Sequence, residues 1–563
     1  MGCGRAKPDP QQVMAYSDGD SIEVTLGAGA AIDPPGYEAN MNVLFIHSEQ
    51  DPYSPEKPLE ILERIQFGIS YISALLKREG HETGLVVLCD ETLHTIEEHV
   101  RKTDPDLVCF TSVFTEYGIM KRAAALVKNR YPEKFTLLGG PHATLRPDDC
   151  LAEGLFDAIC VGEGEYPTLE LVRQLAAGHY PSRIPNLIIR RPDGSVERNE
   201  PRPFLQDLDE LPFPDREMWM PWVANPTSRP SVLVGRGCPF SCTYCSNHAL
   251  RRTSPGKYVR LRSPRNVAEE ISALKQAEPN FSEVYLEVET LGVNRDWALE
   301  LCSELKRINA GFQAPITFGA NLRVTPNADY EELFAALADA NFRFVNIGLE
   351  SGSERIRREV LKRRYSNQDI IRAVETARRH GLQVGLYNLI GLPGEKPRDF
   401  RETIQVNRVC QPDWFLLSVF YPYPGTELYD TCLRLDLMDG PADPYMERRR
   451  PVLDLPGFSK RQVGRRRDWF PLLVYRGNRP TRELLWLVAM AKIYSNHRFA
   501  DIHRRIMERY YARRGRSYES SPEILFARRR EVEGEDGAEI TGPDLVAAGR
   551  ETELSQGDDR HLY

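Results

Sequence analysis

The feature that most constrains the fold is an alternation of short apolar runs with segments of helical periodicity, which fills two long blocks of the chain. The first block spans residues 41–178 and the second spans residues 231–435. Strands that alternate with helices form parallel sheets, because each return to the sheet needs a crossover. The sequence therefore predicts an α/β protein of two units, joined by a proline-rich linker over residues 179–230.

In the first block, five apolar runs predict the strands of a Rossmann-like domain. They cover residues 42–46, 83–88, 107–111, 135–138 and 158–161. Ligands on such sheets bind outside the carboxyl ends of the strands, where polar or glycine-rich loops follow. These loops are residues 47–57, 111–115, 139–144 and 162–165. A hairpin that turns on Asp193-Gly194 is expected within the linker, over residues 186–197.

The second block predicts six strand–helix units, which suit an open, partial (βα)6 TIM-like barrel with its chemistry at the carboxyl ends. The first apolar run leads into Cys238, Cys242 and Cys245, a C-x3-C-x2-C pattern. Three thiolates can hold three irons of a [4Fe–4S] cube, and the fourth iron then stays open to a substrate or cofactor. A zinc site is the alternative, but structural zinc takes four ligands, and beyond His248 no second ligand pair follows.

Composition excludes several other classes of protein. The 563 residues carry a formal charge of −8 and a pI near 5.9, which gives no global basis for binding nucleic acid. No apolar run reaches membrane-spanning length. Residues 1–40 predict a loop-rich extension with one short strand at 21–26, and they lack the apolar segment of a secretory signal. The remaining cysteines are scattered singly, which is typical of a reducing, cytoplasmic location.

The cysteine loop, with an aromatic residue before its last cysteine, resembles the cluster loop of the radical SAM superfamily. The resemblance implies that S-adenosylmethionine (SAM) chelates the open iron and is cleaved by an electron from the cluster. Arg323 would pair with the methionine carboxylate by bidentate geometry, and Glu289 stands where the family often has an Asp pair near the methionine amine. The residues that this resemblance assigns to SAM are Tyr244, Glu289, Arg323, Gly348, Glu350 and Ser351.

The first block resembles the cobalamin-binding (B12-binding) domain that precedes many radical SAM cores, through residues 67–72, 139–144 and 161–165. Its glycines would let the backbone approach a corrin ring. No D-x-H-x2-G motif is present, so no side chain supplies a lower histidine ligand. A domain of this fold that no longer binds cobalamin is the alternative. The residues that the resemblance assigns to cobalamin are Ser112, Gly139, Gly140, His142, Gly162, Glu163 and Gly164.

Together these resemblances imply a radical SAM enzyme that abstracts hydrogen from a small-molecule or lipid substrate, with an external electron donor such as flavodoxin or ferredoxin. With cobalamin bound, the simplest outcome is methyl transfer to carbon. The alternatives are a cobalamin-linked oxidative cyclase or rearrangement enzyme, a cobalamin-free radical SAM enzyme with a structural N-terminal domain, and a non-catalytic Fe–S sensor. A methylthiotransferase is not favoured, because the N-terminal domain lacks the three extra cluster cysteines of that branch.

The rest of the chain resembles no family. Residues 436–530 predict a mostly helical region, in which helices over 482–497 and 498–514 cap the barrel mouth. The basic runs 448–450 and 465–467 predict a solvated face, with an anionic substrate or a partner protein as the alternative. Residues 531–563 are acidic and poor in large apolar side chains, which predicts disorder. The apolar residues expected to face a core are Leu484, Leu485, Leu487, Val488 and Met490.

Overall fold

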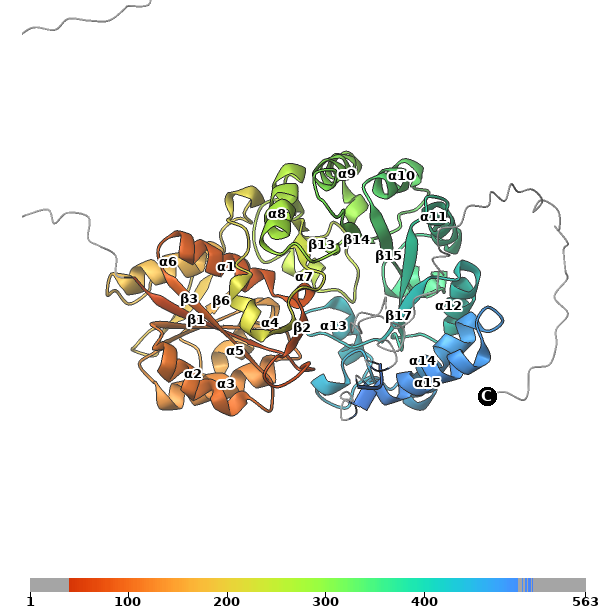
Figure 1. The fold of residues 1–563 in the computed structure, drawn as a ribbon. Helices are drawn as coiled ribbons and strands as arrows, with labels where there is room; N and C mark the ends of the chain where they lie inside the picture. The colour runs from red at the N-terminus through yellow and green to blue at the C-terminus, as the bar shows by residue number, and fades with distance from the viewer. Residues whose placement is uncertain (1–39, 495–498, 500–501, 504, 508, 510–563) are drawn as a thin grey trace, which may run out of the picture.

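Two α/β units lie side by side in the computed structural model, and the C-terminal helices pack on the second unit (Figure 1). The structure describes residues 40–494, 499, 502–503, 505–507 and 509. The strand expected at 21–26, most of the helix expected over 498–514 and the acidic tail lie outside these residues. Within them, every helix is too short or too polar to cross a membrane. The predicted α/β fold class is confirmed.

The first unit is a seven-stranded sheet in the order β3-β1-β4-β5-β6-β7-β8. Its first five strands run parallel, and the last two join antiparallel. The strand order reverses between β1 and β4, so the carboxyl ends of these strands border a crevice suited to a ligand. The strands are β1 (Asn42–Ser48), β3 (Glu82–Leu88), β4 (Leu107–Thr111), β5 (Phe135–Gly139), β6 (Ala158–Cys160), β7 (Leu187–Arg190) and β8 (Val196–Arg198).

The hairpin expected in the linker is present as β7 and β8, and it extends the first sheet. The sheet thus continues past residue 178, into the segment predicted as a linker. Apolar side chains of β1 alternate between two cores, one on each face of the sheet, because successive strand residues point to opposite sides. The helices are α1 (Phe67–Arg78), α2 (Ile96–Thr103), α3 (Tyr117–Arg130), α4 (Pro141–Leu145), α5 (Pro147–Ala152) and α6 (Glu165–Ala176).

The second unit is a six-stranded parallel sheet in the order β10-β13-β14-β15-β16-β17, the open barrel that the sequence predicts. The strands are β10 (Ser231–Leu233), β13 (Glu283–Glu287), β14 (Thr317–Leu322), β15 (Phe342–Glu350), β16 (Gln383–Ile390) and β17 (Trp414–Val419). The covering helices are α8 (Pro264–Ala277), α9 (Arg295–Asn309), α10 (Glu331–Asp339), α11 (Asn367–Arg379) and α12 (Pro397–Cys410).

An aromatic layer fills the inside of the barrel below the carboxyl ends of its strands. Tyr285, Phe344 and Trp414 form a buried cluster of their own, apart from the core under the helices. Trp414 Nε1 donates to Asn346 Oδ1 over 3.1 Å. A Cβ at Gly385 would collide with the Trp414 indole, so the ring fits only because this strand position is glycine. This aromatic layer is the floor of the barrel, and the loops that follow the carboxyl ends of the strands lie above it.

The C-terminal helix α14 (Lys460–Tyr475) packs on the flank formed by α12 and β17, rather than over the barrel mouth, and α15 (Thr481–Tyr494) packs on α14. Phe470 contacts Phe400 and Phe415 there. The prediction for Leu485 is wrong, because its side chain is 47% exposed and points out from the packed face. The other four apolar residues of this helix face are buried as expected: Leu484, Leu487, Val488 and Met490.

The basic runs form a solvated face only in part. Arg448, Arg450 and Arg465 are exposed, as expected. Arg449 and Arg467 contradict the expectation, since each is only 8% exposed. The Arg449 guanidinium lies 2.6 Å from an Asp51 oxygen and thereby joins the C-terminal region to the first unit.

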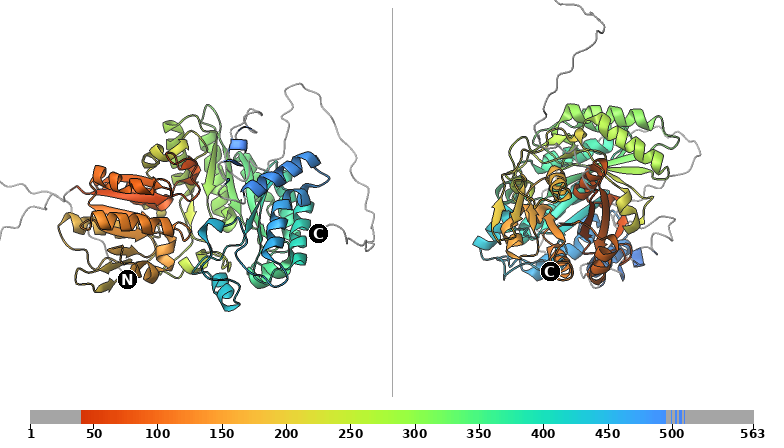
Figure 2. Two further views of the ribbon diagram at one scale, coloured as in Figure 1. Left: turned by 90° about the horizontal axis from the view of Figure 1, so that it is seen from below. Right: turned by 90° about the vertical axis from the view of Figure 1, so that its left-hand side faces the viewer.

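Two small sheets lie where the units abut along one side (Figure 2). The strand β2 (Leu59–Ile61) of the first unit pairs in parallel with β9 (Val223–Asn225), just before the barrel begins. The strand β11 (Gly235–Arg236) pairs antiparallel with β12 (Arg260–Leu261) and frames the cysteine loop. These contacts hold the carboxyl edge of the first sheet close to the barrel.

Candidate functional site

The three cysteines lie on the loop between β11 and a short helix, α7 (Asn247–Leu250). Gly237 opens this loop at φ +84°, and a Cβ there would collide with the carbonyl of Tyr258, so only glycine fits the crossing. Cys242 is buried, whereas Cys238 and Cys245 are partly exposed. Among the described residues no three His, Cys, Asp or Glu side chains are gathered closely enough to hold a single metal ion. The loop therefore offers the ligands of a cluster by the spacing of its cysteines along the chain.

Two residues predicted from the strand ends flank these thiols. Arg323 Nη1 donates to Cys242 Sγ over 2.8 Å, and its guanidinium stacks 3.5 Å from the ring centroid of Phe240. Glu289 lies near the other two cysteines: burial, with a smaller contribution from the Glu289 charge, raises the pKa of Cys238 to about 11. The same two causes raise the pKa of Cys245. A cation and an anion therefore border the cysteine loop on different sides.

A buried arginine that sequence reasoning missed joins the cysteine loop to the turn after β15. Arg363 Nη2 donates to Tyr244 Oη over 2.8 Å and lies 3.1 Å from Glu350 Oε1. Its Nη1 donates to the carbonyl of Gly348 and to Tyr365 Oη, each over 3.1 Å. Three predicted residues, which come from two separate motifs, therefore meet around one guanidinium. The only signal in the sequence was a Lys-Arg-Arg run, which does not show which side chain turns inward.

The turn after β15 is supported by a second buried arginine. Glu350 adopts φ +61°, and Ser351 Oγ accepts a hydrogen bond from Ser353 N over 3.2 Å. Arg357 donates to the Ser351 carbonyl and, over 2.7 Å, to Asn367 Oδ1. Arg357 lies on a single π-helical turn, η6 (Ile356–Val360), where the sequence predicts an ordinary helix, and such turns are frequent at functional sites. The Ser351 hydroxyl, expected at the nucleoside, is thus engaged within the turn.

The loops after β4 and β5, which the sequence assigns to cobalamin, form one edge. Ser112 N donates to the Gly139 carbonyl over 3.2 Å, and the Ser112 carbonyl accepts from His142 N over 3.1 Å. Gly140 adopts φ +93°, and a Cβ there would lie 2.7 Å from the Ser112 carbonyl. His142 is buried and packs 4.3 Å from the Tyr117 ring. Burial lowers the pKa of His142 to about 4, so this edge carries a neutral imidazole at pH 7.

The loop after β6 turns partly toward the second unit. Gly162, at φ +91°, donates to Thr144 Oγ1 over 3.1 Å, which ties this loop to α4. Gly164 caps the start of α6. Glu163, expected to contact cobalamin, instead forms ion pairs with Arg236 and Arg260 of the second unit, at 3.0 and 2.8 Å. Its carboxylate is therefore engaged between the units, a partnership that sequence reasoning missed.

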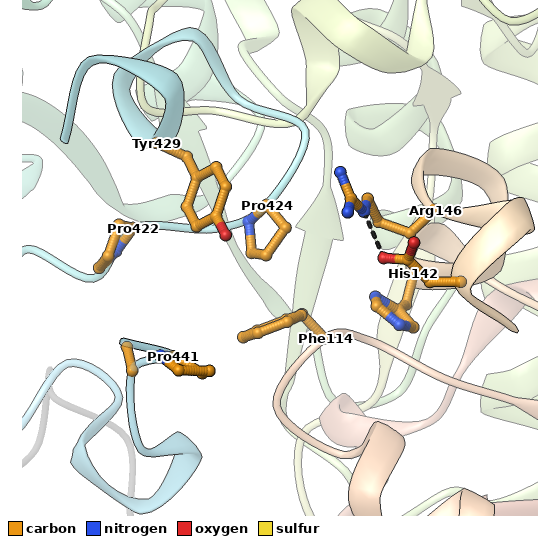
Figure 3. A pocket seen from close by; sticks show the side chains of 9 residues that line it. Phe114, His142, Arg146, Pro422, Pro424, Tyr429 and Pro441 are labelled. Atoms are coloured by element: carbon orange, nitrogen blue, oxygen red, sulfur yellow. Dashed lines mark hydrogen bonds and ion pairs between the residues drawn. The ribbon is translucent and has the colours of Figure 1, made fainter. Parts of the chain in front are cut away.

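A pocket of about 130 Å³ lies between the two units (Figure 3). Its charge is balanced, because Arg146 Nε lies 2.7 Å from Asp149 Oδ2. The wall on the barrel side leads into α13 (Glu427–Arg434), where Leu428 N donates to the Thr243 carbonyl over 2.9 Å. The pocket thus borders both the loops of the first sheet and the segment that holds the cysteine loop. It is lined by Phe114, His142, Arg146, Asp149, Pro422, Pro424, Tyr429, Pro441 and Ala442.

The residues present fit an iron–sulfur cluster better than zinc. Three thiols on one loop leave one corner of a cube open, and a guanidinium at Cys242 offsets the negative charge of thiolate ligands. Zinc would need a fourth ligand, and His248 does not offer one. Its Nδ1 faces the Cys245 carbonyl and its Nε2 accepts from Glu427 N over 3.3 Å, so both ring nitrogens are engaged.

The glycine loops at the carboxyl edge of the first sheet fit the approach of a flat macrocycle, since they expose backbone rather than side chains. The interdomain pocket, however, is smaller than the ~300 Å³ typical of a site for a drug-sized ligand. A corrin is larger than such a ligand. The pocket as it stands is therefore too small to enclose a whole corrin.

Fold and site together define a class of protein: a Rossmann-like domain joined to an open barrel that carries a three-cysteine loop at its carboxyl edge. The radical SAM superfamily domain matches residues 232–406, and the B12 binding domain matches residues 63–172. The chain therefore contains both a B12-binding domain and a radical SAM domain. Members of this class use a [4Fe–4S] cluster, SAM and cobalamin, as the sequence resemblance implies.

Individual relatives match over about two thirds of the chain. The chain is 29% identical over 404 residues to an uncharacterized methyltransferase of Pyrococcus horikoshii, covering 71% of this chain and 85% of the relative. It is 26% identical over 374 residues to the anaerobic magnesium-protoporphyrin IX monomethyl ester cyclase of Rubrivivax gelatinosus, covering 64% and 65%. The radical SAM methyltransferase TsrM from Kitasatospora setae, solved with cobalamin and a [4Fe–4S] cluster, matches with a TM-score of 0.56 at 18% identity, over 72% of this chain and 76% of that chain. At that identity the structural match shows the fold.

Proposed function

We propose that the chain is a radical SAM enzyme that uses cobalamin to transfer a methyl group to carbon of a small-molecule or lipid substrate. One observation carries the proposal: the cysteine loop, the Arg323 guanidinium and the group around Arg363 lie at one edge of the barrel, and that edge faces the glycine loops of the first unit. The relatives named as methyltransferases support the methyl-transfer outcome.

The chain's own residues have three tasks in this proposal. Cys238, Cys242 and Cys245 ligate the cluster, while the barrel floor beneath them keeps the lumen closed to water. In the proposal, Arg323 pairs with the carboxylate of SAM, and Glu350 accepts hydrogen bonds from the nucleoside of SAM. The bound cofactors supply reductive cleavage of SAM and carriage of the methyl group. An external electron donor and a cytoplasmic location remain predictions.

A cobalamin-linked cyclase is the second candidate, because one relative bears that name. Product mass separates the two activities, since methylation adds a CH2 unit and cyclisation does not. A cobalamin-free enzyme remains a third outcome, given the small size of the interdomain pocket.

The proposal is tested by anaerobic reconstitution with iron, sulfide and hydroxocobalamin, followed by desalting and visible spectra. We expect both an Fe–S absorption and a retained corrin band, and formation of 5′-deoxyadenosine from SAM after reduction with dithionite. Cys242→Ala should lose the Fe–S absorption and keep the corrin band. The matched control is Cys302→Ala, which removes a buried thiol of α9 and should keep both. Fe–S absorption without a corrin band would rule out the cobalamin step.

A further inference from the structure

Four charged side chains form a compact ion-pair cluster where the first unit meets the cysteine loop. Arg236 Nη1 lies 3.0 Å from Glu163 Oε1, and Arg236 Nη2 lies 2.6 Å from Glu165 Oε1. Arg260 Nη1 lies 2.8 Å from Glu163 Oε1 and 3.0 Å from Glu163 Oε2. Two carboxylates therefore meet two guanidinium groups, and Glu163 is shared by both arginines.

The cluster carries no net charge and is largely buried, with the side chains of Arg236 and Glu163 16% and 20% exposed. Glu165 and Arg260 are each 4% exposed, and the arginines lie over aromatic rings: Arg236 over Tyr71 at 5.3 Å and Arg260 over Phe204 at 4.9 Å. Burial alone would raise the pKa of Glu163, but Arg236 and Arg260 outweigh it and hold the pKa below its usual value. Geometry of this quality keeps buried charges paired, and loss of one partner leaves another charge stranded.

The position of the cluster links it to the cysteine loop. Arg236 ends β11 and is separated from Cys238 only by Gly237, whose φ of +84° sets the direction of the loop. Arg260 lies opposite Arg236 in the β11–β12 pair. The two glutamates come from the loop after β6 and the first residue of α6, so the first unit holds both strands that frame the cysteines.

We propose that Glu163 is a positioning residue for the cluster loop: through Arg236 and Arg260, the B12-binding domain sets the geometry of the cysteines in the barrel. The inference rests on the proposed function, in which these cysteines ligate the cluster. It adds that the loop assigned to cobalamin is in direct contact with the base of the cluster loop. The two cofactor regions thereby share one structural element, residues 162–165.

The test compares wild type with Glu163→Gln, which keeps the size of the side chain and removes the charge that both arginines share. The matched control is Glu170→Gln, since Glu170 on α6 also pairs with an arginine, Arg202 at 3.0 Å, and does not contact the cysteine loop. The apoprotein is alkylated under anaerobic conditions and then digested with trypsin. Mass spectrometry of the peptide 237–251 gives the rate at which its cysteines are alkylated. In the reconstituted protein, the EPR spectrum of the reduced cluster is recorded with and without SAM.

Glu163→Gln is expected to speed alkylation of the cysteine peptide on the order of tenfold, because a weakened clamp lowers the cost of local opening. It is also expected to broaden the EPR signal and to reduce the change that SAM produces. Glu170→Gln should match wild type in both readouts. Equal alkylation rates and equal EPR spectra in wild type and Glu163→Gln would overturn the inference.

Arg236→Lys provides a second variant for the case in which Glu163→Gln does not fold. It keeps the positive charge but loses the fork that reaches Glu163 and Glu165 together. We expect a folded protein whose cysteine peptide is alkylated faster than that of wild type; a wild-type rate would also contradict the inference. If wild type itself assembles no cluster, the proposed function fails instead, so the two failures are distinguishable.

Discussion

At the scale of single residues, Arg363 is the side chain on which the SAM-facing part of the site depends most. It reaches Tyr244 on the cysteine loop and Glu350 at the end of β15, two segments that are far apart in the sequence. We expect Arg363→Lys to weaken SAM binding to the reconstituted protein on the order of tenfold, because a lysine cannot serve both partners. Calorimetric titration with SAM would measure this.

The control for that variant is its exposed neighbour, Arg364→Lys, which should bind SAM as wild type does. Equal affinities for Arg363→Lys and Arg364→Lys would show that the arginine bridge has no part in SAM binding. Since both substitutions conserve charge, a difference between them reports geometry rather than net electrostatics.

The sequence predicted those parts of the site whose reactive residues lie together in a short motif or directly after a strand. The cysteine spacing marks its loop without any tertiary information, and Arg323 follows from its place just after a strand. Arg363 and Glu163 could not be assigned in the same way. Arg363 lies in a basic run that resembles any solvated segment, and the partners of Glu163 are Arg236 and Arg260, which local periodicity does not bring together.

At the scale of elements, the barrel strands depend on glycines that make room for the aromatic floor. We expect Gly385→Ala to lower the free energy of unfolding by about 1–3 kcal/mol, because its Cβ would collide with the Trp414 indole. Gly464→Ala should have the opposite effect, since nothing lies within 4 Å of its Cβ position in α14.

The free energy of unfolding of that variant should rise by about 1 kcal/mol, because alanine has a higher helix propensity than glycine. Urea unfolding of wild type, Gly385→Ala and Gly464→Ala would measure the expected decrease and the expected increase in the free energy of unfolding.

The existence and order of the strands were predictable because each apolar run is short, buried and followed by an amphipathic helix. The pairing of β2 with β9 was not, because three-residue strands carry no periodic signal and their partners are far apart in the sequence. The place of α14 and α15 could not be predicted either. Their apolar faces required burial, but only the tertiary structure shows that α14 packs on α12 and β17 and that α15 packs on α14.

At the scale of the whole molecule, buried neutral histidines should make stability sensitive to acid. Burial lowers the pKa of His142 to about 4, well below the value of about 6.5 in the unfolded chain. Between these values the unfolded state binds more protons, so His142 contributes stability at pH 7 that is lost as the pH falls from about 6.5 to about 4. His47, with its pKa lowered to about 3, acts in the same direction.

We therefore expect the stability lost between pH 7.5 and pH 5 to shrink by about 1–2 kcal/mol in His142→Gln. Denaturant unfolding at the two pH values measures it, with the exposed His179→Gln as the control. If His142→Gln and the control lose the same stability on acidification, the histidine is not held neutral by the fold.

The β2–β9 pairing has a consequence for how the chain is made at the ribosome. β2 emerges early, but its partner follows only after the whole first sheet has been synthesised, at Val223–Asn225. In the nascent first domain, β2 therefore stays unpaired until the linker that carries β9 leaves the exit tunnel. Barrel synthesis then begins six residues later at Ser231, so closure of that edge and the start of the second domain are nearly simultaneous events in translation.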